Sequence, residues 1–245
     1  MKTKNPAINR LSDFARGLEV GSGLTMTFQG TINKIAILFL LMFASAVFTW
    51  SRGPEAAQKL MIIGLIGGLI LALITIFKAN ISHITAPIYA IFEGLFIGGI
   101  SLMFNTLMDG IVQTAVILTF AIFAAMLLLY KARIIRATEK FRSIVIAATG
   151  AIFVFYLISF IMRLFGIQIL NLHSMGLIGI GISVAIVIIA SLNLILDFDA
   201  IEQGVNSGAP AKMEWYAAFG LIVTLVWLYI EVLRLVWLLS SIMDD

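Results

Sequence analysis

The chain lacks cysteine and carries few charges. None of its 245 residues is cysteine, two are histidine and 12% are charged, whereas roughly a quarter are charged in an ordinary soluble domain. The absence of cysteine excludes disulfides, thiolate metal sites and cysteine nucleophiles. The low charge leaves too little polar surface for a soluble protein of this size.

Hydrophobic residues make up 61% of the chain, and long apolar runs recur along it. Each run is long enough to cross a hydrocarbon core of roughly 30 Å as a helix. Backbone polar groups in lipid must be satisfied within each segment, so we expect an all-α membrane protein, a seven-transmembrane-helix bundle. Residues 1–30 would form a polar cytoplasmic N-terminal segment, and residues 31–241 the seven-span domain. The predicted spans are 35–50, 60–77, 84–104, 111–130, 143–162, 175–196 and 215–240.

Lysine and arginine are distributed unevenly between the connections. Twelve lie in the N-terminal tail and the even-numbered connections, against three on the opposite side. Cytoplasmic loops carry the excess of Lys and Arg, which predicts a cytoplasmic N-terminus and an external C-terminus. The basic residues lie beside spans, so the net charge of +3 indicates orientation rather than nucleic-acid binding. Residues 1–30 are polar and do not resemble a signal peptide, so the first span is retained.

Five charged residues fall within spans or at their ends. Charges in spans are costly and usually face the bundle interior or a water-filled path. Glu93 lies in the third span, and a purely structural role is equally open for it. Asp197 and Asp199 lie at the cytoplasmic end of the sixth span and could simply end that helix in interfacial water, an interpretation that we favour for Asp199. Glu231 and Arg234 in the seventh span are three residues apart, so they share a helix face and can pair.

No complete catalytic site is present in the sequence. The segment Gly181-Ile-Ser183 lacks the second glycine of a nucleophile elbow, and there is no H-E-x-x-H motif. Asp197-Phe-Asp199 lacks the remaining ligands of a calcium-binding loop. We therefore expect that the protein is not an enzyme. Small residues in spans two and three predict close helix packing: Gly64, Gly67, Gly68, Gly94, Gly98 and Gly99.

An ordered set of motifs lies along the spans: Glu93-Gly94, Leu196-Asp197-Phe198 and Leu228-Tyr-Ile-Glu231. With the seven spans, this set resembles the bacterial branch of the Bax-inhibitor-1 family over roughly residues 25–240. The resemblance implies a multi-pass protein of the bacterial cytoplasmic membrane that acts as a pH-sensitive calcium leak or sensor.

In the family, an acid late in span six and an acid in span seven form a hydrogen-bonded gate. Asp197 and Glu231 match these two positions, Asp199 matches a polar one, and Glu93 would line or brace the path. The resemblance implies no cofactor beyond calcium as permeant ion or ligand of Asp197 and Glu231. Two close carboxyls in low dielectric share a proton, and calcium prefers oxygen ligands.

Two features depart from the family pattern. Arg234 stands where the family commonly has a neutral polar residue, and its charge favours ionised Glu231. The connection between spans six and seven is also longer, which places Asp197 about 12 Å and Glu231 about 22 Å from the helix ends at 1.5 Å per residue. Either part of 205–220 is not a simple helix or the two acids do not touch.

A second hypothesis is a non-conducting membrane regulator that binds partner proteins such as membrane proteases or stress machinery. The acids would then be structural. The basic connection between spans four and five would bind the partner, and it contains Lys131, Arg133, Arg136, Lys140 and Arg142. The expected partners are thus the lipid bilayer, calcium or protons, and a membrane protein, but no nucleic acid.

Overall fold

The computed structural model describes residues 24–166 and 176–243, and these contain seven helices long and apolar enough to cross a membrane. The predicted all-α, seven-helix architecture is therefore confirmed. Most of the predicted segment 1–30 lies outside the described residues. The helices are α2 (Phe28–Trp50), α3 (Pro54–Phe77), α4 (Ser82–Leu107), α5 (Ile111–Lys131), α6 (Glu139–Leu164), α7 (Leu177–Asn206) and α8 (Met213–Met243), with a short 3-10 helix, η1 (Ala79–Ile81), before α4.

Several helices extend beyond the apolar runs that predicted them. α2 begins at Phe28, seven residues before the predicted span, and α7 continues to Asn206, ten residues past it. The prediction that Asp199 ends its helix is wrong, because α7 continues for almost two turns beyond it. Hydropathy marks the lipid core, whereas helical hydrogen bonding continues through polar residues at the membrane surface.

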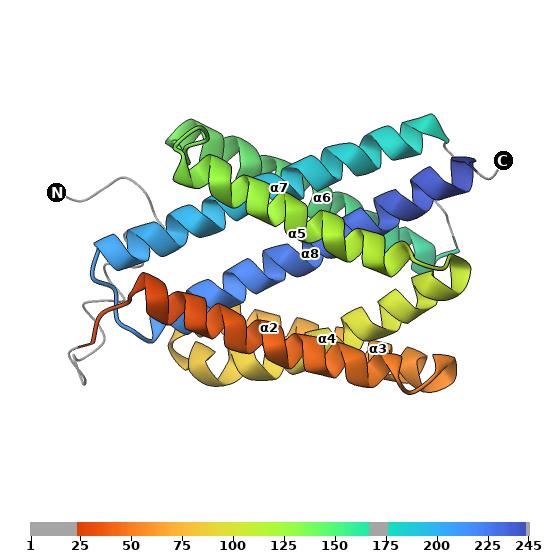
Figure 1. Cartoon of the computed structure of the whole chain (residues 1–245), viewed down its shortest axis with the longest axis horizontal. Helices are drawn as coiled ribbons and strands as arrows, with labels where there is room; N and C mark the ends of the chain where they lie inside the picture. Colours follow the sequence, from red (N-terminus) through yellow and green to blue (C-terminus); the bar gives the residue numbers. More distant parts are fainter. Residues whose placement is uncertain (1–23, 167–175, 244–245) are drawn as a thin grey trace.

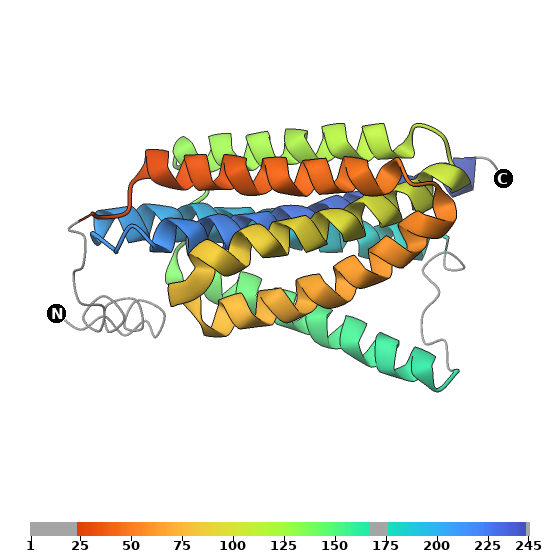
Figure 2. The ribbon, with the colours of Figure 1, turned by 90° about the horizontal axis from the view of Figure 1, so that it is seen from below.

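α8 is the central helix of the bundle. It contacts α2, α4, α5 and α7, and Figure 1 shows it between the group α2, α3 and α4 and the group α5, α6 and α7. In Figure 2, α2 and α5 form one outer layer, α4, α7 and α8 the middle, and α3 and α6 the other outer layer. The most buried polar side chain on α8, Glu231, is therefore surrounded by the bundle.

Glycines allow α4 to approach its two neighbours closely, as the sequence predicted. A Cβ at Gly94 would lie 2.2 Å from the carbonyl oxygen of Met42 on α2. On the α3 side, a Cβ at Gly64 would lie 2.5 Å from the backbone nitrogen of Phe96. Only hydrogen fits at these positions, so the backbones of α2, α3 and α4 pack at the short separation that small residues permit.

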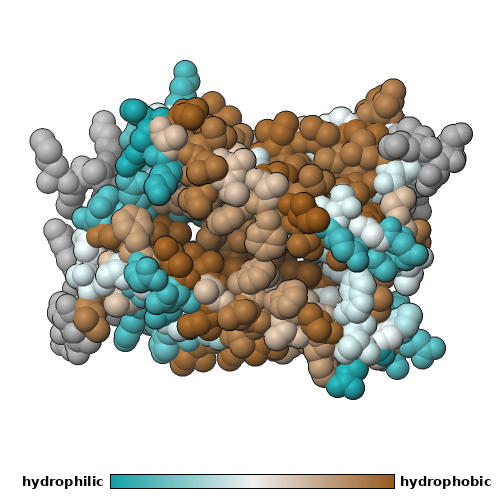
Figure 3. Space-filling view, in the orientation of Figure 1, coloured by the Kyte–Doolittle hydropathy of each residue, from teal (hydrophilic) through white to brown (hydrophobic). Residues whose placement is uncertain are grey.

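The two ends of the bundle differ from its middle. Hydrophobic side chains cover the middle of the face in Figure 3, and hydrophilic side chains gather at both ends. We call the end that holds the α5–α6 connection, with Arg133 and Arg136, the basic end. The loop between α7 and α8 lies at this end too, because α7 and α5 both finish there.

At the basic end, the residues before α2 are bonded to the α7–α8 loop. The Met26 amide donates to the Ala209 carbonyl at 2.7 Å. Glu214, 6% exposed at the start of α8, accepts hydrogen bonds from the amide and hydroxyl of Thr27 at 3.0 and 3.1 Å. Thr27 also caps α2, because its hydroxyl accepts from the Gly30 amide. These bonds fix the start of α2 against the start of α8.

Candidate functional site

Glu231 is the most enclosed acid of the bundle, with 1% of its surface exposed. Its Oε1 accepts hydrogen bonds from the Tyr156 hydroxyl of α6 at 2.9 Å and from the Trp227 indole at 3.2 Å. The Arg234 guanidinium donates to the same oxygen at 3.2 Å, which confirms the predicted pairing within α8. Arg234 also donates to the Tyr156 hydroxyl at 2.7 Å. A buried charge is thereby balanced by a cation and two neutral donors.

Tyr156 belongs to a line of polar side chains along α6. Arg142, Thr149 and Tyr156 are seven residues apart, and seven residues are close to two helical turns, so the three share one face. Each bonds a polar group of the middle layer. Arg142 pairs with Asp199 at 2.5 Å, and Thr149 accepts from Asn193 of α7 at 2.8 Å. We call this set the α6 polar line.

The α6 polar line is the main attachment of that helix. Among the residues of α6, all of which the structure describes, Val145 alone is buried. Figure 2 shows α6 diverging from the other helices towards its Leu164 end. Since few apolar side chains of α6 are buried, the free energy that holds this helix in place depends on polar bonds inside the membrane region, which are worth about 1 kcal/mol each or less.

Asp197 lies at a different level from Glu231. Its carboxyl is beside Thr224 of α8, and its Oδ1 is 3.8 Å from where a Cβ at Gly220 would lie. The Asp197 carboxyl thus lies between α7 and α8, close to the backbone of Gly220. Its Oδ2 is buried and accepts no hydrogen bond from the described residues, as is also true of Oε2 of Glu231.

No hydrogen bond joins Asp197 to Glu231 within the described ranges. Thr224 and Glu231 are seven residues apart on α8, which is about 10 Å along the helix axis. Both of the alternatives left open by the sequence hold in this conformation. Residues 207–212 form a loop rather than a simple helix, and the two acids do not touch. A proton shared between the two carboxyls stays a prediction. The Asp197 carboxyl of α7 and the Glu231 carboxyl of α8 therefore lie at successive levels of the bundle.

Glu93 belongs to another interface. Its Oε2 lies 2.8 Å from where a Cβ at Gly68 of α3 would be, and its carboxyl is beside the Tyr89 hydroxyl, one turn earlier on α4. Tyr89 in turn packs edge-on against Phe219 of α8, with ring centroids 4.9 Å apart. Glu93 is therefore positioned to brace α3 against α4, on the other side of the bundle from the α6 polar line.

Asp199 is part of a network at the basic end. In addition to its pair with Arg142, it accepts a hydrogen bond from Gln203 one turn later. Glu202 accepts from the hydroxyl of Tyr130, the penultimate residue of α5, and pairs with Arg133 at 2.6 Å. The hydrogen bond that Arg133 donates to Glu202, together with the charge of that carboxylate, raises the pKa of the exposed Arg133 guanidinium. These bonds fasten the α5–α6 connection to the last turns of α7.

The Arg142–Asp199 pair is expected to contribute measurably because both side chains are less than a quarter exposed. Arg142→Met and Asp199→Ala, alone and combined, form a double-mutant cycle. We expect a coupling free energy of about 1–2 kcal/mol, above the value for exposed pairs. The measurement is the free energy of unfolding in mixed micelles titrated with dodecyl sulfate. The control is the pair of Arg133 and Glu202, in which the arginine side chain is 58% exposed, and equal coupling in both cycles would contradict the expectation.

The sequence did not identify Tyr156, Thr149, Asn193 or Trp227 as parts of the site. The seven-residue spacing of Arg142, Thr149 and Tyr156 on α6 was the available signal. It was not decisive, because threonine and tyrosine often occur in membrane helices without a polar partner. The acids that the sequence did identify do not gather. Within residues 24–166 and 176–243, no three His, Asp or Glu side chains converge as they would around a resident metal ion.

A comparison with sequence families gives one match over nearly the whole chain. Residues 3–241 match the model of the family described as Bax inhibitor 1 like. No curated protein and no solved structure matches the chain.

Proposed function

This chain belongs to the Bax inhibitor 1 like family of multi-span membrane proteins, and we propose that it is a pH-sensitive leak pathway for calcium. The path would follow the α6 polar line, between α6 and the middle-layer helices α7 and α8. The membrane would be the bacterial cytoplasmic membrane, with the basic end in the cytoplasm. Calcium enters this proposal as the permeant ion.

The observation that carries the proposal is the alignment of the α6 polar line with polar groups of α7 and α8, of which Glu231 is a buried acid. Polar groups occur at three levels of this interface, at Asp199, at Asn193 and at Glu231. An ion crossing a bilayer needs oxygen atoms at successive depths to replace its water, and binding must be weak enough at each for the ion to leave. Single polar groups at successive levels, two carboxylates and one amide, meet that need better than a closed cage of ligands would.

Glu231 is proposed as the gate. In the conformation described, its carboxylate attracts Arg234 and accepts from Tyr156, which fixes α6 against α8. Protonation would remove the negative charge of Glu231, which would weaken the charge-assisted hydrogen bond that the Tyr156 hydroxyl of α6 donates to it. Because α6 has few buried apolar contacts, the helix would then separate from α8 and open the path. The leak should accordingly increase as the pH falls.

Asp197 is proposed to attract the cation. It lies between the levels of Asp199 and Glu231 along α7 and α8, and its Oδ2 is buried without a hydrogen-bond donor among the described residues. A hard cation could coordinate this oxygen together with carbonyl oxygens and water. In this mechanism the two acids have separate tasks, and a shared proton is not required.

Calcium flux into proteoliposomes tests both proposed roles, Glu231 as the gate and Asp197 as the cation ligand. For the wild type, we expect a leak above that of empty liposomes that rises as the pH falls. Glu231→Gln should leak at every pH and lose the pH dependence, because it cannot ionise. Asp197→Asn should keep the pH dependence and reduce the flux at each pH, because the cation loses a charged ligand.

The matched control is Asp109→Asn, which removes an exposed acid at the opposite end of the bundle and should behave as the wild type. If wild-type liposomes are no leakier than empty ones at any pH, the leak proposal is wrong. If Glu231→Gln keeps the wild-type pH profile, the gate is elsewhere.

The alternative function is the non-conducting regulator, and one observation favours it. Of the basic side chains in the α5–α6 connection, Arg133 and Arg142 pair with acids of α7. Lys131, Arg136 and Lys140 remain exposed beside Ile134, which is 70% exposed. A protein partner with an acidic and apolar surface would fit this segment. The absence of flux, together with such a partner bound through the α5–α6 connection, would support this alternative.

A further inference from the structure

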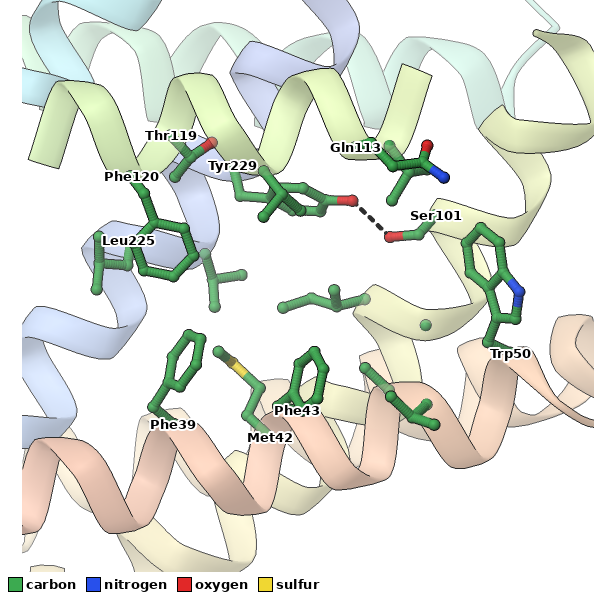
Figure 4. A pocket seen from close by; sticks show the side chains of 17 residues that line it. Phe39, Met42, Phe43, Trp50, Ser101, Gln113, Thr119, Phe120, Leu225 and Tyr229 are labelled. Atoms are coloured by element: carbon green, nitrogen blue, oxygen red, sulfur yellow. Dashed lines mark hydrogen bonds between the residues drawn. The ribbon is translucent and has the colours of Figure 1, made fainter. Parts of the chain in front are cut away.

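A crevice unrelated to the buried acids lies between α2 and α5. Its volume is about 470 Å³, within the range of small-molecule pockets. α4 and α8 form its floor, as Figure 4 shows, where Ser101 and Tyr229 are joined by a 2.6 Å hydrogen bond. That bond and the bond of Thr119 to its own helix satisfy polar groups of the lining, and most of the remaining surface is aliphatic or aromatic. The crevice therefore suits an apolar occupant and does not suit an ion.

The crevice opens sideways. Phe43 and Val47 on the α2 wall are 58% and 51% exposed, and Val116 and Phe120 on the α5 wall are 37% and 46% exposed. The two walls and the floor are helices that can span a membrane, so the opening faces the region of the bilayer that acyl chains fill. An occupant can enter from the membrane without passing through water.

The length of the crevice matches one leaflet. At one end, Phe39 and Phe120 pack edge-on with ring centroids 5.6 Å apart and close the space near the middle of α2. Trp50, at the last residue of α2, marks the other end. These positions are eleven residues apart, about 16 Å along the helix, and one leaflet contributes about 15 Å of hydrocarbon.

The Trp50 end also offers groups that suit a phospholipid headgroup. Tryptophan is typical of the membrane–water interface. Arg52 follows two residues later, is exposed, and has its guanidinium 4.2 Å from the Phe48 ring centroid. Gln113 on the α5 wall is exposed at the same end. A cation and an amide at the open end of an apolar crevice complement a phosphate joined to an acyl chain.

We propose that this crevice holds one acyl chain of a bilayer phospholipid, with the headgroup at Trp50 and Arg52. The bound chain fills the space between α2 and α5 that side chains leave open. This site is independent of the calcium path, because none of the buried acids lines it.

The test uses the protein in nanodiscs of phosphatidylethanolamine and phosphatidylglycerol that include a phosphatidylethanolamine with a diazirine on one acyl chain. After illumination, adducts are mapped by mass spectrometry. We expect them to concentrate on the crevice walls, at Val47 and Val116. Val47→Trp should fill the crevice and abolish adducts on the α5 wall, and Val116→Trp should abolish them on the α2 wall.

Ile63→Trp on α3 is the matched control, because Ile63 and Val47 are both 51% exposed and Ile63 does not line the crevice. It should leave the adducts unchanged. Adducts spread evenly over the exposed residues of all helices would overturn the proposal, as would unchanged adducts in both crevice variants. Labelling by a photoreactive free fatty acid but not by the phospholipid would also overturn it.

Discussion

Replacing Glu231 by leucine is expected to destabilise the protein by about 3 kcal/mol, the lower end of the range for breaking a buried ion pair. Glu231 is 1% exposed, and the Arg234 side chain is 23% exposed. Removal of the carboxylate leaves the guanidinium in the bundle with only the Tyr156 hydroxyl as a hydrogen-bond partner among the described residues. The measurement is the free energy of unfolding in mixed micelles titrated with dodecyl sulfate.

The double variant Glu231→Leu with Arg234→Leu separates the pair from its surroundings. Replacing both charges by apolar side chains of similar volume is often neutral or stabilising, so most of the lost stability should return. A double variant as unstable as Glu231→Leu would contradict this explanation. It would then be the hydrogen bonds of Tyr156 and Trp227 to the carboxylate that stabilise the bundle.

A side chain at Gly94 is expected to have the other large effect. Even the Cβ of alanine would lie 2.2 Å from the Met42 carbonyl oxygen and 2.7 Å from Ser45 Cβ. Neither neighbour is the end of a flexible side chain, so α2 and α4 must separate. We expect Gly94→Leu to cost more than about 3 kcal/mol, beyond the usual range for overpacking. The yield of folded monomer on size exclusion and its unfolding free energy provide the measurement.

Gly150→Leu is the control for helix propensity and hydrophobicity. Gly150 is also in a membrane helix, but a Cβ there meets nothing within 4 Å. This variant should be neutral or more stable by up to about 1 kcal/mol, because leucine favours the helix more than glycine does. Similar losses in both variants would show that close packing of α2 and α4 is not the cause.

Features that depend on a single helix could be predicted from the sequence. The length and hydropathy of the apolar runs predicted the seven helices. The ordered motifs within those runs predicted the family. The spacing of three residues predicted the bond between Glu231 and Arg234, because both ends of that bond are fixed by the helical repeat. The clustered glycines of α3 and α4 predicted close approach, since no side chain prevents it.

Features that depend on how helices meet were decided by the tertiary structure. Asp197 faces Thr224 and Gly220, and Glu231 faces Tyr156. The relative rotation and axial position of α6, α7 and α8 decide which side chains of these helices meet. The crevice between α2 and α5 likewise exists only because α4 and α8 hold those helices apart. A helical period fixes neighbours along one chain segment, but contacts between segments depend on the packing of all seven helices together. The sequence by itself therefore determined the helices and their polar faces, and the packing of the bundle decided which polar groups meet.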